Sequence, residues 1–312
     1  MGDHYEVGRE KIREFARAVQ DFHPAHWDDA AARELGYPGL VAPVTFASAT
    51  GGVLQRDMFR AALPDYAPSR LLHVEQELRC HRPVVAGDRL LYDVTVDSRR
   101  ELAGGDIIVV STAISDVDTG PVQSVHTTLI GRRGDPARDI ETLSMPERPI
   151  PLPTESDAAP VPRRRYTPRR PRPAAAGDIS AGRRFPARSY RLARGDLVNY
   201  AGVSGDNNPI HWNDAAALAA GMSSVVAHGM LTMGMAAGYL SEFLSDPGAV
   251  TTLAVHFANP VLVDTQRPAE ITFTGAAIQA APESTTIALT AHSTGVPIYG
   301  NATATINREL PE

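Results

Sequence analysis

The chain has 312 residues, of which 43% are hydrophobic and 21% are charged. This length suggests two domains of ordinary size, and the apolar fraction is sufficient for two cores. The formal net charge of −6 argues against a dedicated nucleic-acid-binding protein, which is usually basic. Cys80 is the single cysteine, which excludes an intrachain disulfide and a thiolate metal cluster.

The start of the chain and its hydropathy predict a cytoplasmic protein. The opening segment MGDHYEVGREKIREF is charged and lacks an apolar core of signal-peptide length. No apolar run approaches the ~18 residues that a membrane span requires. We therefore expect no membrane span and no nucleic-acid partner.

The first half of the chain predicts helices followed by strands. Apolar spacing indicates short helices at residues 9–19 and 28–35, and a longer, mostly apolar helix at residues 45–59. Alternating or β-branched stretches, bounded by Gly or Asp, then indicate strands near residues 71–79, 89–96, 106–114 and 122–130.

A proline-rich segment follows. Residues 146–173 read PERPIPLPTESDAAPVPRRRYTPRRPRP, in which prolines recur too often for a helix or a central strand. We expect an extended linker over residues 146–182 with polyproline character. Its arginines are either a solvated connector or a patch for an acidic partner such as a carrier protein; they stand at positions 163, 164, 165, 169, 170 and 172.

The second half predicts the same order of elements. Residues 194–203 and 214–220 have the spacing of short helices, and residues 229–244 form a long apolar helix. Strands are then expected near residues 252–258, 269–273, 285–291 and 298–306.

The two halves are an internal repeat. A fixed offset of 185 residues aligns Asp21 with Asp206 and His26 with His211. The same offset aligns further residues of matching type or class: Phe15 with Tyr200, Ala16 with Ala201, Pro24 with Pro209, Trp27 with Trp212, Gly36 with Gly221 and Ala42 with Ala227. Further on, HRPVVAGD at 81–88 resembles ANPVLVDT at 258–265 with a slightly shorter offset. One helix-then-sheet unit has been duplicated and has diverged.

This order of elements predicts an α+β fold. A long apolar helix followed by antiparallel strands is best buried when the sheet curls around the helix. Two such units, at residues 1–145 and 183–312, can pair through their sheets as a pseudo-dimer within one chain. Two chains could still associate as a homodimer.

The stretch YAGVSGDNNPIH, from Tyr200 to His211, carries the candidate chemistry. Gly205 and Pro209 bracket a tight bend, around which Asp206 and His211 can turn toward one point. A carboxylate near an imidazole can hold one water and tune the imidazole for proton transfer near neutral pH.

The entry to the long helix of the second half predicts an anion site. Ala227, His228 and Gly229 lead into this helix, whose first turn leaves backbone N–H groups without partners. Those groups and the helix dipole suit an enolate-like thioester oxygen. Glycine at position 229 would let that oxygen approach the backbone closely.

The residues from Tyr200 to His211 also carry a family resemblance. The pattern Y-x-x-V-S-G-D-x-N-P-I-H, followed by five residues and Ala217, resembles the signature of the (R)-specific enoyl-thioester hydratases of the MaoC-like family. The layout of the whole chain resembles fused (3R)-hydroxyacyl-acyl carrier protein dehydratases. The resemblance implies a double hot-dog fold, in which each unit is a curved antiparallel sheet wrapped around a long central helix.

The resemblance also implies a reaction. The chain would be a hydro-lyase of fatty-acid metabolism that adds or removes water across the C2–C3 bond of a (3R)-hydroxyacyl or trans-2-enoyl thioester. Asp206 and His211 would be catalytic, and which of them moves which proton stays open. The backbone of Gly229 would form part of the oxyanion hole. No cofactor is implied, because the substrate is carried on coenzyme A or on acyl carrier protein.

Neighbouring residues receive supporting roles in this interpretation. Ser204, Gly205 and Asn208 would organise the loop. His228 and Tyr200 are candidate substrate contacts, although a histidine at a helix entry more often packs or caps. We expect no metal, because His211 and His228 have no clear third protein ligand at metal spacing.

Two other functions compete with this one. A non-catalytic acyl-thioester-binding protein would share the fold but would have no use for an intact Asp206/His211 pair. A hot-dog thioesterase would release free thiol, and many carry an acidic residue early in the long helix, where this chain has GMLT at 229–232.

The first half preserves Asp21 and His26 in changed surroundings. At the repeat offset, Gln20 replaces Gly205, and Phe22 and His23 replace Asn207 and Asn208. Pro43 and Val44 stand where the second half has His228 and Gly229. We predict that Asp21 and His26 are a relic or a structural pair; a second active site is the alternative.

Overall fold

The computed structural model describes residues 4–50, 63, 66, 71–102, 105–132, 179–281 and 283–307. The predicted linker at 146–182 lies outside the described residues up to position 178. The predicted helix at 45–59 is described only as far as residue 50.

The first half follows the predicted order of helices and strands. Its elements are β1 (Tyr5–Glu6), α1 (Arg9–Ala18), the 3₁₀ turn η1 (Pro24–His26), α2 (Asp29–Glu34), α3 (Phe46–Thr50), β2 (Leu71–Cys80), β3 (Arg89–Leu102), β4 (Gly105–Asp116) and β5 (Gly120–Arg132). Gly8 precedes α1, and Asp28 caps α2 by accepting a hydrogen bond from the Ala30 N–H.

The second half repeats this order. Its elements are β6 (Arg184–Leu192), α5 (Arg194–Ser204), η4 (Pro209–His211), α6 (Asp214–Ala219), α7 (Gly229–Ser241), η5 (Pro247–Ala249), β7 (Val250–Phe257), β8 (Ala269–Ala280), β9 (Ser284–Ser293), β10 (Val296–Pro297) and β11 (Tyr299–Asn307). None of the helices in the described part of the chain is long and apolar enough to cross a bilayer.

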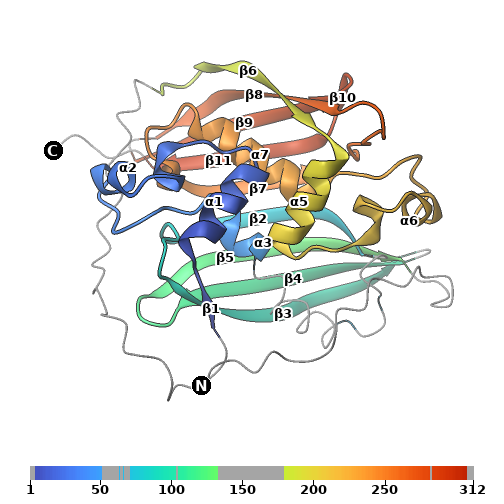
Figure 1. Ribbon diagram of the computed structural model, residues 1–312, viewed down its shortest axis with the longest axis horizontal. Helices are drawn as coiled ribbons and strands as arrows, with labels where there is room; N and C mark the ends of the chain where they lie inside the picture. The colour runs from blue at the N-terminus through green and yellow to red at the C-terminus, as the bar shows by residue number, and fades with distance from the viewer. Residues whose placement is uncertain are drawn as a thin grey trace.

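All of these strands join one antiparallel sheet. The strand order is β1-β3-β4-β5-β2-β7-β11-β9-β8-β6, and β10 pairs with β9. The strands of the first half thus occupy one side and those of the second half the other, joined where β2 pairs with β7. Figure 1 shows the sheet extending across the molecule, with α1, α3, α5 and α7 lying over its central strands. The α+β class with a large antiparallel sheet is confirmed.

The pairing of β2 with β7 displays the repeat as a local two-fold axis. Glu77 faces Ala254, its own counterpart at the offset of 177 that relates residues 81–88 to 258–265. Leu78 pairs with Leu253 and Gln76 with Val255, so the neighbouring pairs exchange under the same offset. The two halves are therefore related as the subunits of a symmetric dimer.

The helices obey the same symmetry. Phe15 on α1 and Tyr200 on α5 are counterparts at the offset of 185, and their rings pack together with centroids 6.1 Å apart. Both rings are buried where α1 packs against α5. The internal repeat and the pseudo-dimer are therefore visible in the packing.

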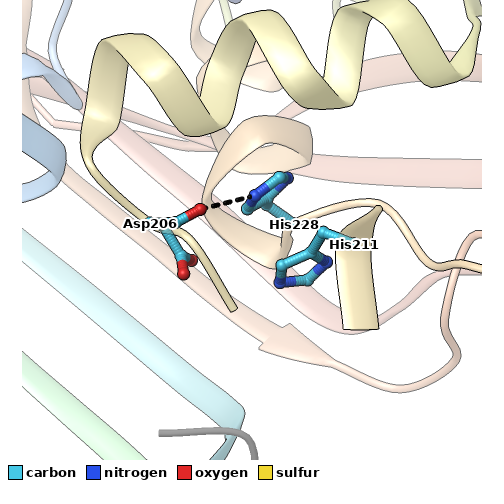
Figure 2. Close-up of side chains that lie close together, drawn as sticks. All are labelled: Asp206, His211 and His228. Carbon is cyan, nitrogen blue, oxygen red and sulfur yellow. Dashed lines mark hydrogen bonds between the residues drawn. The ribbon is translucent and has the colours of Figure 1, made fainter. Parts of the chain in front are cut away.

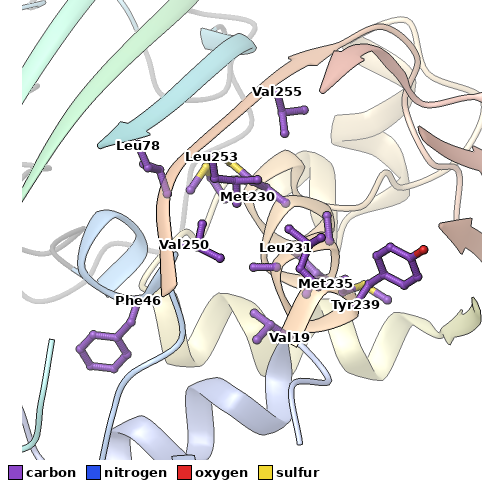
Figure 3. Close-up of a cluster of buried hydrophobic side chains, with 14 of the residues drawn as sticks. Val19, Phe46, Leu78, Met230, Leu231, Met235, Tyr239, Val250, Leu253 and Val255 are labelled. Atoms are coloured by element: carbon purple, nitrogen blue, oxygen red, sulfur yellow. The ribbon is translucent and has the colours of Figure 1, made fainter. Parts of the chain in front are cut away.

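Helix α7 is the central helix of the second half. It is apolar on every side, and every residue from Met230 to Ser241 is buried, as expected of a helix enclosed by other elements. Figure 3 shows Leu231, Met235 and Tyr239 of α7 within the buried cluster that also contains Val19 of the first half.

Two glycines bring α7 against the first half. A Cβ on Gly234 would lie 2.5 Å from Val19 Cγ1, and one on Gly238 would lie 3.1 Å from Asp21 Cβ. The first distance is too short for a side chain, and the second is tighter than most Cβ contacts. Glycine at these two positions therefore favours the close approach of the two halves.

The structure adds strands that the sequence analysis missed. β6 lies at one edge of the sheet, and most of its side chains are exposed. Pro186 within it is tolerated because an edge strand needs only one set of partners. Its run of arginines and its single proline resemble the preceding linker, which is why it escaped notice. β8 also extends seven residues beyond the predicted end at Phe273, through small residues such as Gly275 and Ala277.

Candidate active site

The loop after α5 holds Asp206 in place. Gly205 ends the helix in the left-handed region, with φ of 79°, where glycine carries no steric penalty. The Ser204 hydroxyl donates to the Tyr200 carbonyl at 2.7 Å and accepts from the Asp206 N–H at 3.2 Å. The Asn208 N–H donates to Asp206 Oδ1, also at 3.2 Å. The expected loop roles of Ser204, Gly205 and Asn208 fit these contacts.

The imidazole of His211 is fixed from behind. Pro209 begins the 3₁₀ turn, and Asn208 caps it by accepting from the Ile210 N–H. His211 Nδ1 lies 2.8 Å from the Val226 carbonyl oxygen, which can only accept, so Nδ1 carries the proton. The neutral ring then presents a lone pair on Nε2. His211 is 7% exposed.

His228 lies directly behind His211. The two rings stack with centroids 3.7 Å apart and planes inclined by 24°. His228 Nε2 donates to the backbone carbonyl of Asp206 at 3.2 Å, as Figure 2 shows. The ring of Tyr200 packs against that of His228, with centroids 4.9 Å apart. His228 and Tyr200 are each 1% exposed, so both pack behind Asp206 and His211 within the core.

Asp206 and the two histidines surround a small space. One oxygen of Asp206 and one nitrogen of each ring lie within 4.8 Å of one another. Among the described residues, no ion pair within 4.0 Å joins Asp206 to either ring. The Asp206 side chain is exposed to solvent, unlike the rings. A single water can therefore hydrogen-bond the carboxylate and an imidazole together.

The surroundings adjust the charge of each group. Burial lowers the pKa of His211, and Asp206 opposes this only in part. Burial and the neighbouring His211 lower the pKa of His228 to about 3. Loss of hydration beside the surrounding protein raises the pKa of Asp206. The nearby His228 and His211 and the Asn208 N–H outweigh this effect and leave the pKa below 3.8. At neutral pH the site therefore contains a carboxylate beside neutral imidazoles.

The three side chains could also be considered as metal ligands. The expectation that His211 and His228 have no third ligand is wrong, because a carboxylate oxygen of Asp206 lies within 4.8 Å of a nitrogen of each ring. However, the two rings lie nearly parallel, so their in-plane lone pairs do not converge on one point. A tetrahedral ion needs such convergence. This arrangement suits a water better than a metal.

The N-terminus of α7 opens beside these residues. The helix begins at Gly229, directly after His228, and leaves its first N–H groups without helical partners. A Cβ on Gly229 would lie 3.3 Å from the ring of Phe257. A side chain at position 229 would therefore push the Phe257 ring away from this turn by a few tenths of an ångström. The N–H of Gly229 is where the sequence analysis expected an oxyanion hole.

The counterpart in the first half has the same scaffold but is closed. His26 Nδ1 lies 2.6 Å from the Val41 carbonyl, which matches His211 and Val226 at the offset of 185. Asp21 Oδ2, however, lies 3.1 Å from His26 Nε2, and the two residues are 2% and 0% exposed. No water fits between groups that are already in contact. This geometry favours a structural pair at Asp21 and His26.

One residue near the site was not singled out from the sequence. His73 of β2, in the first half, lies close enough to Asp206 for each to shift the pKa of the other, although burial is the larger effect on His73. Nothing in the local pattern around His73 distinguishes it from other strand residues, so no sequence signal could have identified it.

Comparison with known families covers both halves. Residues 1–125 match the FAS1-like dehydratase domain region, and residues 176–294 match the MaoC-like domain. A UPF0336 protein of Mycobacterium tuberculosis is 44% identical over 133 residues, which cover 43% of this chain and 84% of that protein. A UPF0336 protein of Mycobacterium leprae matches to the same extent.

Solved structures match the whole chain. A MaoC-like dehydratase is 40% identical, with a TM-score of 0.84 over 99% of this chain and 97% of the other. HtdX of Mycobacterium tuberculosis, at 19% identity and a TM-score of 0.63, covers 99% of both chains and shares the fold. So does a Mycobacterium tuberculosis protein described as a double hot-dog, at 13% identity and a TM-score of 0.66, over 98% of this chain and 94% of the other. The chain is thus a double hot-dog protein and belongs to the MaoC-like dehydratase family.

Proposed function

We propose that this protein reversibly hydrates trans-2-enoyl thioesters to (3R)-hydroxyacyl thioesters, with one active site at Asp206 and His211. The observation that carries the proposal is the open acid–base pair. A carboxylate oxygen of Asp206 and a ring nitrogen of His211 lie within 4.8 Å of each other without forming an ion pair. They stand at the start of a helix that offers free N–H groups. Membership of a dehydratase family supports the reaction type.

The geometry suggests how the proton moves. His211 Nε2 takes a proton from a water that Asp206 holds, while the water oxygen bonds to C3. The C2–C3 electron pair shifts toward the thioester oxygen, which the Gly229 N–H stabilises. The imidazolium then returns the proton to C2, so that the elements of one water are added. Asp206 orients the water and stabilises the imidazolium in between. Dehydration is the reverse sequence.

The competing thioesterase reaction has less support. The first turn of α7 contains no acidic residue, and Thr232 donates its hydroxyl to the Gly229 carbonyl at 2.8 Å within the helix itself. Asp206 is the carboxylate at this site, and it belongs to a different loop. An attack on the thioester carbonyl would need a base aimed at C1 instead of C3.

The identity of the substrate carrier is part of the proposal. We expect an acyl thioester of coenzyme A or of acyl carrier protein in fatty-acid metabolism, with no dissociable cofactor. A homodimer of the pseudo-dimeric chain is a further expectation, which sedimentation at several protein concentrations would test.

The decisive experiment follows the ultraviolet absorbance of short and long trans-2-enoyl-CoA. Three proteins are compared: the wild type, Asp206→Asn and Asp21→Asn. Loss of a catalytic acid–base group costs on the order of 10²–10⁴ in rate. We expect turnover by the wild type and by Asp21→Asn after correction for folded fraction, and a loss of this size in Asp206→Asn.

Other outcomes would redirect the proposal. If folded Asp21→Asn is also inactive, the first half contains a working site. Release of free thiol without loss of the enoyl chromophore would identify a thioesterase. If neither coenzyme A nor carrier-protein substrates are consumed but an acyl thioester binds, the protein is a non-catalytic binder.

A further inference from the structure

A β-bulge in β2 turns His73 toward the interior of the molecule. In the pairing of β2 with β5, His73 faces Leu129 and Glu75 faces Thr128, so Val74 between them has no partner. The extra residue shifts the alternation of side chains by one. His73 consequently shares a face with the buried Gln76 and does not join the exposed Glu75.

His73 then meets the second half beside the start of α7. Its ring packs against Phe257 of β7, with centroids 6.0 Å apart. Phe257 in turn lies against Gly229, where a Cβ would come within 3.3 Å of the ring. A chain of contacts thus leads from the first half to the expected oxyanion site. His73 and Phe257 are both only partly buried.

Within the described part of the chain, the Nε2 atom of His73 is buried and has no hydrogen-bond partner. A buried polar atom left unpaired destabilises a fold, and in native proteins it commonly marks a functional position. Burial lowers the pKa of His73, and the nearby Asp206 carboxylate and a hydrogen bond with the Gln76 side chain oppose this shift.

We propose that His73 is a substrate-contacting residue that the first half contributes to the active site of the second, with its Nε2 hydrogen-bonding an oxygen of the bound acyl thioester. The inference rests on the proposed function for the position of the substrate. The arrangement gives the first half a direct role in recognition, in addition to completing the sheet. It also makes the site dependent on the pairing of β2 with β7.

The test replaces His73 with leucine and with glutamine. Leucine removes the hydrogen-bonding atom, whereas glutamine keeps a neutral donor and acceptor. For enoyl-CoA hydration we expect His73→Leu to lower kcat/KM by roughly 5- to 50-fold, the range for one hydrogen bond. The change should appear mainly in KM, because the contact exists in the bound substrate as well as in the transition state. His73→Gln should recover most of the loss.

Stability separates this role from a structural one. Removing an unpaired buried nitrogen should leave the unfolding temperature of His73→Leu equal to or above that of the wild type, while activity falls. A purely structural histidine would lose stability in parallel with activity.

The matched control is His81→Leu. His81 is exposed, bonds Ser124 Oγ at 2.8 Å, and lies about 26 Å from His73 along the strand direction. It should leave the kinetic constants unchanged. If His73→Leu matches His81→Leu within twofold, the inference is wrong while the proposed function stands.

A second measurement covers an inactive wild type. Binding of a saturated acyl-CoA is then measured by calorimetry for the wild type, His73→Leu and His81→Leu. If only His73→Leu binds the acyl-CoA more weakly, the contact between His73 and the substrate is supported, while the proposed hydration reaction is rejected. Equal binding by all three, or no binding at all, would overturn the inference as well.

Discussion

Ser241 of α7 donates a 2.6 Å hydrogen bond to Asp21 Oδ1, so the central helix of the second half seals the acid–base pair of the first. Gly238, one turn earlier on the same face, allows the Asp21 backbone to approach. Asp206, the counterpart of Asp21, remains exposed to solvent. One duplicated loop has therefore become a joint between the halves, and the other has kept an open site.

Asp21→Asn should reduce stability and leave the catalytic constants nearly unchanged. The substitution removes a buried charge that His26 and Ser241 satisfy, which should cost about 1–3 kcal/mol of unfolding free energy. Urea denaturation of the variant measures this loss. Asp206→Asn is the control, and its midpoint should shift far less. Equal stability of Asp21→Asn and the wild type would show that the closed pair contributes nothing.

Asp21 should also make stability depend on acid pH. Burial raises its pKa, but the adjacent His26, the Ser241 hydroxyl and the His23 N–H outweigh this and leave the folded-state pKa below the usual 3.8. Its stabilisation is therefore fully present above 3.8 and is lost as the pH falls through the folded pKa. The difference in unfolding free energy between the wild type and Asp21→Asn should shrink on acidification below 3.8. A constant difference would contradict this.

Gly234→Ala should disturb the contact between α7 and the first half. The new methyl would lie 2.5 Å from Val19 Cγ1, and overpacking of this kind costs about 1–3 kcal/mol. Thermal denaturation of Gly234→Ala, Val19→Ala and the double variant forms a cycle in which the double variant recovers part of the loss. Gly202→Ala on α5 meets nothing within 4 Å and should be neutral or stabilising. Additive effects of Gly234→Ala and Val19→Ala would rule out the steric explanation.

Hydration should stay active well into the acid range. Burial lowers the pKa of His211 below 6.5, so its neutral form persists below that pH. The pKa of Asp206 is also lowered, so its carboxylate stays ionised over the same range. The acid limb of kcat/KM should therefore be centred below pH 6.5. A profile of initial rates in a constant-ionic-strength buffer series measures it, and a limb centred at or above 6.5 would exclude neutral His211 as the base.

His228 should act through its position behind His211. His228→Ala removes the ring that stacks on His211 at 3.7 Å and should lower the unfolding free energy by about 2–4 kcal/mol through the cavity it leaves. His228→Phe refills the space but cannot bond the Asp206 carbonyl. It should recover stability while kcat/KM stays reduced, which combined denaturation and rate measurements would show. Full activity in His228→Phe would mean that the hydrogen bond to Asp206 is dispensable.

The order of helices and strands, and the loop that carries Asp206 and His211, could be predicted from the sequence. Helix and strand periodicities are local, so residues 9–19 and 229–244 were recognisable without knowledge of their partners. The repeat offset of 185 and the motif around Asp206 depend only on spacing. Edge strand β6 escaped because its exposed arginines and Pro186 lack an alternating apolar pattern.

The sequence by itself determined that two related units exist and that one carries an intact Asp206 and His211. Only the tertiary structure decided that Asp21 is sealed by Ser241 and that His73 lies near Asp206, 133 positions away. Those relations depend on the pairing of β2 with β7, on the bulge at Val74 and on the glycines of α7. Each is a contact between distant segments, and the free energy that selects it is a property of the packed molecule and not of any local stretch of sequence.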